Sequence, residues 1–450
     1  MSNTVSLTQG KIFQPLLHFT IPILLAMCLQ AAYGAVDLAV VGWFATAADV
    51  SAVNIGAQIL QGATVVIMGL SMGTTILLGH KLGGNKAQEA APVIGSALCF
   101  FAVLGLILTF IGNAYALQIA QLVNTPPEAL AATMSYTRIC LSGSVFIIAF
   151  NLVGSIFRGL GDSQTPLIAV SIACVCNIFG DLLLVGYFGM ATAGAALATV
   201  ASQLISVIVC LQIVKRRGLP FPFSLSAAKP RLDFLWQMVK LGFPLALQDA
   251  LVAVSFLVIL VIINGLGVIV SAGVGVAEKL CGFIMLVPSA FGQSLSAFVA
   301  INAGAKADDR ARKALFYGIG ASLCVAVIMG YLAGFQGPRL AKIFAGDNTE
   351  VIWNATEFLK AYAIDTFLTS IMFCMCGYFN GYGKTKFVML QGIIGAFCVR
   401  IPVSYFMSLE RPVSVFHIGL ATPSSTVVQI ILCVLYYRIF QKWLHKSRLV

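Results

Sequence analysis

The sequence contains Phe157-Arg158-Gly159-Leu160-Gly161 and, 222 positions later, the similar stretch Phe379-Asn380-Gly381-Tyr382-Gly383. Two further pairs keep nearly the same offset: Pro22 and Pro244 at 222, and Leu82-Gly83-Gly84 and Ala303-Gly304-Ala305 at 221. Three anchors at nearly one offset, in a chain of 450 residues, predict that the protein consists of two copies of one half.

The composition indicates that lipid surrounds most of the chain. The sequence is 59% hydrophobic and 10% charged, whereas soluble domains carry about 25% charged residues. Apolar runs of about 20 residues, the span of a bilayer, recur along the whole length. Such runs must be helical, because every backbone group in hydrocarbon has to be paired internally. The sequence therefore predicts an all-α polytopic membrane protein.

We expect twelve transmembrane helices in two six-helix lobes. The spans lie at roughly 12–44, 51–79, 91–116, 131–157, 166–188, 191–214, 233–264, 270–302, 313–335, 353–380, 386–407 and 414–440. Loops on one side then hold nineteen of the 27 Lys and Arg residues, and the other side holds Arg339, Lys342 and Arg411. By the positive-inside rule both termini are cytoplasmic. The net charge of +11 thus reflects topology and lipid headgroups, and we expect no nucleic-acid partner.

The repeat divides the chain into an amino-terminal lobe, 1–222, and a carboxy-terminal lobe, 223–450. Because each half has an even number of spans, the halves are related by an axis along the membrane normal, and a functional site is expected between them. The sequence lacks a Gly-x-x-x-x-Gly-Lys-Ser/Thr motif. We therefore expect no ATP hydrolysis, no enzymatic activity and no cofactor.

Acidic residues inside spans are the main functional candidates, because a charge at the bilayer centre costs about 2.5–3.5 kcal/mol on insertion scales. Asp37 shares a helix face with Gln30 and Gly34, and Asp181 lies one turn after Asn177. A desolvated carboxylate can take up and release a proton near neutral pH. We interpret Asp37 and Asp181 as ion-coupling residues, the alternative being polar clamps between helices.

Three acids of the second half are secondary candidates: Asp249, Glu278 and Asp365. Glu278 precedes Lys279, which could simply neutralise it. The bases nearer the span ends are expected to reach the membrane surface with their long side chains; they are Arg138, Lys240, Lys360 and Arg400. The twelve cysteines all lie in apolar spans, and neither they nor the four histidines suggest a metal site or a catalytic residue.

Several stretches resemble the multidrug and toxic compound extrusion (MATE) family over essentially the whole chain. They are Pro22 followed by Asp37-Leu38-Ala39-Val40-Val41-Gly42, Arg158-Gly159-Leu160-Gly161-Asp162 through Thr165-Pro166, Asn177-Ile178-Phe179-Gly180-Asp181, and Gly194-Ala195-Ala196-Leu197-Ala198-Thr199. The resemblance implies an antiporter in the cell (plasma) membrane that exports small organic, often cationic compounds in exchange for H⁺ or Na⁺. It implies two lobes around a central cavity, and we expect a monomer.

The resemblance also suggests site residues. In the archaeal and DinF-like branches, whose pattern this chain resembles more than the NorM-like one, the coupling acids lie in the amino-terminal lobe. Those positions fall on Asp37 and Asp181, with Asn177 beside them as a further Na⁺ ligand. By spacing, Tyr136, Thr199 and Asn151 match other members of that polar cluster. In the NorM-like branch, acids of the seventh and tenth spans bind the cation; Asp365 matches the tenth-span acid, whereas Asp249 is out of register.

Alternating access would follow from protonation of the two acids on the outer side and their deprotonation on the cytoplasmic side. The alternative function is a flippase for lipid-linked or polyprenyl carriers, which would need a strongly basic cavity. The repeat itself favours a coupling site in the amino-terminal lobe, because the acids of the first half have no counterparts in the second half. Shifted by 222, Asn177 and Asp181 become Val399 and Val403, and Asp37 becomes Ile259.

Overall fold

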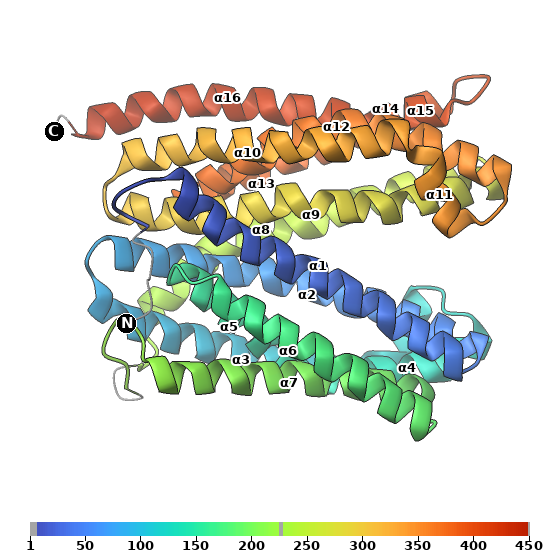
Figure 1. Ribbon diagram of the computed structural model, residues 1–450, viewed down its shortest axis with the longest axis horizontal. Helices are drawn as coiled ribbons and strands as arrows, with labels where there is room; N and C mark the ends of the chain where they lie inside the picture. Colours follow the sequence, from blue (N-terminus) through green and yellow to red (C-terminus); the bar gives the residue numbers. More distant parts are fainter. Residues whose placement is uncertain (1–6, 225–227, 449–450) are drawn as a thin grey trace. The chain divides into compact units, whose positions relative to one another are not determined.

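The computed structural model describes residues 7–224 and 228–448, with the backbone alone for 447 and 448. The described chain is helical throughout and contains no strand (Figure 1). The helices of the first half are α1 (Phe13–Phe44), α2 (Ala47–Gly83), η1 (Ala87–Glu89), α3 (Ala90–Leu122), α4 (Pro127–Ser142), α5 (Ser144–Gly159), α6 (Gln164–Asp181), the π-helix η2 (Leu182–Tyr187) and α7 (Ala191–Arg217). Arg448, one of the basic residues assigned to the cytoplasmic side, has no described side chain.

The second half begins at α8 and repeats this order of long helices. Its elements are α8 (Leu232–Asn264), α9 (Val268–Gly304), α10 (Asp308–Phe335), α11 (Gly337–Ala345), α12 (Thr349–Gly381), α13 (Thr385–Ile393), the π-helix η3 (Ile394–Arg400), α14 (Ile401–Ser408), α15 (Val415–Gly419) and α16 (Ala421–Arg448). Eleven described helical segments are long and apolar enough to cross a membrane, and the bent pair α4–α5 supplies a twelfth span. The predicted all-α polytopic fold is therefore confirmed.

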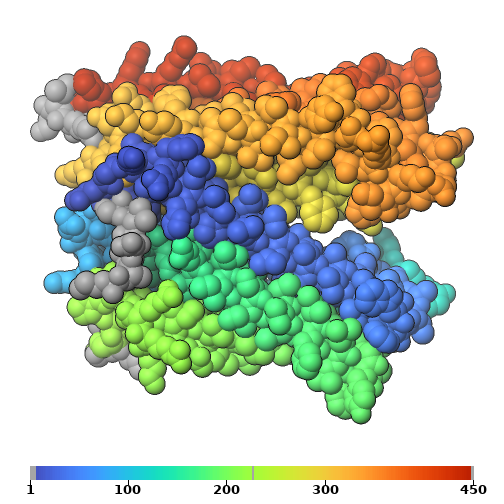
Figure 2. Space-filling view, in the orientation of Figure 1, coloured from blue at the N-terminus to red at the C-terminus, as the bar shows by residue number. Residues whose placement is uncertain are grey.

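The chain forms two compact units. The first unit comprises Met1–Gly10, Leu17–Ala246 and Ala300–Ala307, and the second comprises Lys11–Leu16, Leu247–Val299 and Asp308–Val450. Within the second unit, α12 packs against α10 and α16, and Figure 2 shows α16 extending along its neighbours. Within the first unit, α6 packs against α7, and both expose large apolar side chains, as expected for helices in contact with lipid.

Backbone conformations repeat with the sequence. Six of the eleven described residues with left-handed φ angles form pairs separated by 221 or 222 positions: Asn85 and Lys306 (both 57°), Asn124 (53°) and Gly346 (61°), and Gly161 (80°) and Gly383 (71°). Left-handed φ is uncommon outside glycine, so coincidence at three loops is not expected. The duplicated turns are therefore equivalent in structure as well as in sequence.

The fourth span departs from its counterpart by breaking at Gly143. Helices α4 and α5 meet there at 53°, whereas α12 continues without a break. Side-chain hydrogen bonds join the break to α3: Thr109 Oγ1 donates to the Leu141 carbonyl before the break at 3.0 Å, and Ser144 Oγ after the break donates to the Gly105 carbonyl of α3 at 2.8 Å. The first bond pairs a carbonyl at the break, where an unpaired backbone group would be costly inside a membrane.

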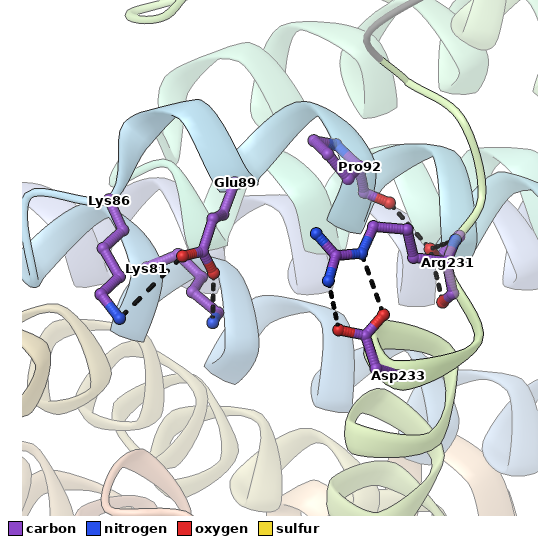
Figure 3. A network of polar contacts seen from close by, with 7 residues as sticks. Lys81, Lys86, Glu89, Pro92, Arg231 and Asp233 are labelled. Atoms are coloured by element: carbon purple, nitrogen blue, oxygen red, sulfur yellow. Dashed lines mark hydrogen bonds and ion pairs between the residues drawn. The ribbon is translucent and has the colours of Figure 1, made fainter.

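The segment entering α8 is fixed to the ends of α2 and α3 by charged side chains around Phe234. The Phe234 ring, which is buried, lies 4.9 Å from Lys81 Nζ and 4.6 Å from the Arg231 guanidinium carbon. Lys81 also pairs with Glu89 at 2.5 Å, and Arg231 pairs with Asp233 at 2.8 Å (Figure 3). The entry to α8 thus has defined contacts within the first unit.

Candidate functional site

The candidate site in the first unit is centred on Asp37, which lies in α1 and is 6% exposed. Asn177 of α6 donates from Nδ2 to Asp37 Oδ1 at 3.2 Å, and Thr199 of α7 donates from Oγ1 to Asp37 Oδ2 at 3.4 Å. Side chains of α6 and α7, 140 and 162 positions away in the chain, therefore meet at one carboxylate of α1. Hydrogen bonds of this kind hold a carboxylate in position in its charged form.

Asp181 lies in the same cluster and is completely buried. It is the last residue of α6, immediately before the π-helix η2, and π-helical turns often mark functional positions. Its carboxyl group is close enough to that of Asp37 for one to donate a hydrogen bond to the other when protonated. Neither Asp181 oxygen accepts a hydrogen bond from a protein donor.

Two carboxylates thus lie together, and no described basic side chain is close enough to form an ion pair with either. Among the described residues, neither Asp37 nor Asp181 has a basic side chain within 4.0 Å. Two adjacent buried charges of one sign repel strongly, and a buried carboxylate without a partner is costly. The pair therefore requires a proton or a small cation for charge balance.

Oxygen atoms around the pair are the type that binds hard cations. They comprise the four carboxylate oxygens of Asp37 and Asp181, together with the Asn177 Oδ1 atom, which has no hydrogen-bond partner. The described residues contain no group of three His, Cys, Asp or Glu side chains, the arrangement that transition metals favour. The donor set fits H⁺ or Na⁺.

The structure brings most of the expected first-lobe residues together. Tyr136, which is buried, interacts with Thr199 and Cys140. The Asn151 side chain does not join this network through its amide donor. Its Nδ2 donates instead to the Ile147 carbonyl of its own helix at 2.8 Å.

Two polar residues of the site, Gln203 and Cys140, were not predicted from the sequence. Gln203 is buried and interacts with Tyr33, which in turn lies near Asp37. Gln203 occurs four residues after Thr199, and Cys140 four residues after Tyr136, so both lie one helical turn from a predicted site residue. This spacing was the available signal in the sequence.

The acids of the second unit have different surroundings. Asp365 is completely buried in α12, Glu278 is half-buried in α9, and Asp249 is exposed on α8. Glu278 forms no ion pair with Lys279, whose side chain is exposed, but it acts electrostatically on Tyr362.

The prediction that Arg400 reaches the membrane surface is wrong. Arg138, Lys240 and Lys360 are exposed as expected of bases near span ends, but Arg400 is 6% exposed and lies at the end of η3. Its Nη1 donates to Ser255 Oγ at 3.2 Å, and its guanidinium carbon lies 4.5 Å from the Phe256 ring centre. The side chain does not extend to the membrane surface, because these partners hold it inside the unit.

A polytopic helical membrane fold with a buried carboxylate pair is typical of membrane transporters. The MatE family model matches residues 22–183 and 244–406, once in each half. The chain belongs to the MatE family. It is accordingly a membrane transporter and not an enzyme.

Curated relatives extend over nearly the whole chain. The probable multidrug resistance protein YoeA of Bacillus subtilis is 23% identical, with 98% of this chain and 97% of the relative covered. The multidrug export protein MepA of Staphylococcus saprophyticus is 25% identical, with 89% of this chain and 88% of the relative covered.

Solved structures show the same fold. An outward-facing multidrug resistance MATE transporter has a TM-score of 0.92 at 18% identity and covers 99% of each chain. A MATE protein in complex with MaL6 also has a TM-score of 0.92 at 18% identity, covering 99% of this chain and 100% of its own. These matches confirm the two-lobed fold of twelve helices.

Proposed function

We propose that this protein is a secondary antiporter of the cell membrane that exports small organic cations in exchange for H⁺ or Na⁺. The observation that supports this most directly is the pair Asp37 and Asp181, buried together with no basic side chain of the described residues within 4.0 Å. The names of the relatives YoeA and MepA, a multidrug resistance protein and a multidrug export protein, agree with organic compounds as the exported class.

The coupling ion is bound in the amino-terminal lobe, 1–222, while the carboxy-terminal lobe, 223–450, moves against it as the site opens to each side in turn. Binding of one cation neutralises one of the two carboxylates and removes their repulsion, so occupancy alters how α1, α6 and α7 pack around Asp37. Packed interfaces tend to be bistable rather than continuously deformable, so such a local change can select one of two arrangements.

The energy available from one coupling ion is sufficient for export. One charge that crosses 100 mV gains about 2.3 kcal/mol, which corresponds to roughly a 50-fold concentration ratio at equilibrium. No nucleotide-driven step is needed at this ratio. The protein works as a monomer, with both termini on the cytoplasmic side.

Transport by the purified protein in liposomes tests the proposal. Ethidium serves as the organic cation, and a proton gradient and a sodium gradient are imposed separately. Asp181→Asn and Asp37→Asn should each lower gradient-driven transport at least about tenfold, since each removes one of the two carboxylates that bind the coupling ion and a tenfold loss corresponds to only about 1.4 kcal/mol. Asp309→Asn is the matched control, because Asp309 is an exposed acid of α10.

Undiminished transport in both site variants would contradict the assignment of the coupling residues. If ethidium transport by the wild-type protein depended on neither the proton gradient nor the sodium gradient, antiport itself would be contradicted. A response to the proton gradient alone, or to the sodium gradient alone, identifies the ion.

A further inference from the structure

The break in the fourth span receives a side chain of the neighbouring helix α7. A Cβ atom at Gly143 would overlap Val200 Cγ1 and would lie only 2.6 Å from Val200 Cγ2, whereas carbon atoms pack at about 3.5–4.0 Å. Both methyl groups of Val200 lie in this space, so every staggered rotamer of the valine would leave at least one methyl group facing Gly143. A side chain at Gly143 would therefore displace α7 itself.

The displaced part of α7 carries a residue of the ion site. Thr199 directly precedes Val200 in the continuous helix Ala191–Arg217, and its Oγ1 donates to Asp37 Oδ2 at 3.4 Å. This distance is near the upper limit for a hydrogen bond. A small movement of α7 at Val200 would therefore be enough to break the bond between Thr199 and Asp37.

The break has a defined geometry because of its own sequence and its contacts with α3. The sequence Leu141-Ser142-Gly143-Ser144 lies at the break, and sharp kinks in helices are typical of Gly/Ser pairs. Thr109 Oγ1 bonds the Leu141 carbonyl before Gly143, and Ser144 bonds α3 after it. These contacts fix the ends of α4 and α5 on both sides of the space that Val200 fills.

The second unit lacks the break together with the site. Shifted by 222 positions, Gly143 becomes Asp365, which lies inside the continuous helix α12. Thr199 becomes Ala421, which has no hydroxyl group, and the counterpart of Asp37 is an isoleucine. The break, the hydroxyl donor and the acceptor carboxylate therefore occur together in the first half and are all missing from the second.

We infer that Gly143 is a positioning residue of the ion site: it leaves room for Val200 and thereby places Thr199 against Asp37. The inference rests on the proposed function, because it assigns Gly143 to the site that binds the coupling ion. Gly143 acts through α7 rather than on the carboxylate directly. Its substitution should therefore weaken binding of the coupling ion and leave binding of the organic cation unchanged.

Ethidium transport in liposomes tests this separation. The coupling ion and ethidium are varied in turn, so that each gives its own concentration for half-maximal transport. Gly143→Ala should raise the half-maximal ion concentration at least about fivefold, because it disrupts a hydrogen bond to a charged group, and should leave the ethidium value unchanged. Gly330→Ala is the matched control in the second unit, where a Cβ atom would lie 2.9 Å from the Phe367 ring. It should not change the ion value.

Two further variants distinguish positioning from a general loss of stability. Thr199→Val removes the donor and keeps the shape of the side chain, so adding Gly143→Ala to it should change the ion value little, since both substitutions act on one bond. Val200→Ala should restore ion affinity to the Gly143→Ala protein, because it vacates the overlapping space. If Gly143→Ala does not fold, Val200→Ile takes its place, because it enlarges the same contact from α7.

Three results would overturn the inference alone, provided that wild-type transport depends on an ion. They are an unchanged ion value in the folded Gly143→Ala protein, fully additive effects of Gly143→Ala and Thr199→Val, and no rescue by Val200→Ala. If wild-type transport depended on neither H⁺ nor Na⁺, the proposed function would fail and this inference would fail with it.

Discussion

Asn177 Nδ2 lies 3.2 Å from Asp37 Oδ1, although the two residues are 140 positions apart in the chain. The bond joins α6 to α1 at the centre of the first unit, where both residues are buried. An amide donor stabilises the ionised carboxylate without neutralising it. On the proposed function, Asn177 leaves Asp37 able to exchange a cation, which a basic side chain at the same position would not.

Replacement of Asn177 should weaken ion coupling without removing an acid. Asn177→Ala deletes the donor to Asp37, and a lost hydrogen bond to a charged group costs about 1.5–3 kcal/mol. We expect a lower unfolding temperature and at least about tenfold weaker gradient-driven ethidium transport in liposomes. Asn113→Ala is the control, because Asn113 also donates from Nδ2 to a side-chain oxygen, Ser142 Oγ, at 2.9 Å outside the site. Equal effects of the two variants would contradict a specific role for Asn177.

Much of this architecture could be predicted from the sequence, because membrane helices follow hydropathy and duplicated turns keep their glycines. Asp37 and Asp181 could be found because an acid in an apolar span is rare and costly. Their proximity follows from tertiary packing of α1 against α6, which periodicity does not specify. Only the family resemblance indicated it.

The direction of the Arg400 side chain and the π-helix η3 could not be predicted from the sequence, because they too depend on tertiary packing. Arg400 was expected at the membrane surface, because its place near a span end allows either an outward or an inward direction. The π-helix η3 ends at Arg400 and rotates the residues after it relative to an α-helix. The orientation of a side chain at such a turn depends on partners such as Ser255, which are contributed by another helix.

Gly56 of α2 provides space for Tyr136. A Cβ atom at Gly56 would lie 2.9 Å from Tyr136 Cγ and closer still to Cδ1, so the buried ring would have to move. Gly56→Ala should therefore lower transport several-fold while costing about 1–3 kcal/mol of stability, typical of an overpacked core. Ethidium transport and thermal unfolding of the purified variant are the measurements.

Gly62→Ala is the matched control in the same helix, since a Cβ atom at Gly62 meets nothing within 4 Å. Both substitutions raise helix propensity equally. If Gly62→Ala impaired transport as much as Gly56→Ala did, displacement of Tyr136 would not be the cause.

The contacts around Phe234 should stabilise the entry to α8. Phe234→Ala removes a buried ring that lies near both Lys81 and Arg231, and loss of a buried Phe typically costs about 3–5 kcal/mol. Trp236→Ala, two residues later on the same helix, removes a side chain that is 66% exposed and should cost less than about 1 kcal/mol in detergent. Thermal unfolding of the two variants compares them, and similar unfolding temperatures would show that the Phe234 contacts contribute little.

Two glycines related by the repeat bring α2 and α9 together within the first unit. A Cβ atom at Gly304 would clash with the His80 carbonyl, and one at Gly83 would clash with the Ile301 carbonyl, so each backbone approaches the other. Backbone atoms cannot move aside as a flexible side chain can, and Gly304→Ala should destabilise the protein by about 1–3 kcal/mol or more. A Cβ atom at Gly275 in the same helix would meet nothing within 4 Å, so Gly275→Ala should be neutral or slightly stabilising. Thermal unfolding of both variants in detergent measures the difference, and a Gly304→Ala protein as stable as the Gly275→Ala protein would refute this close crossing of the duplicated helices.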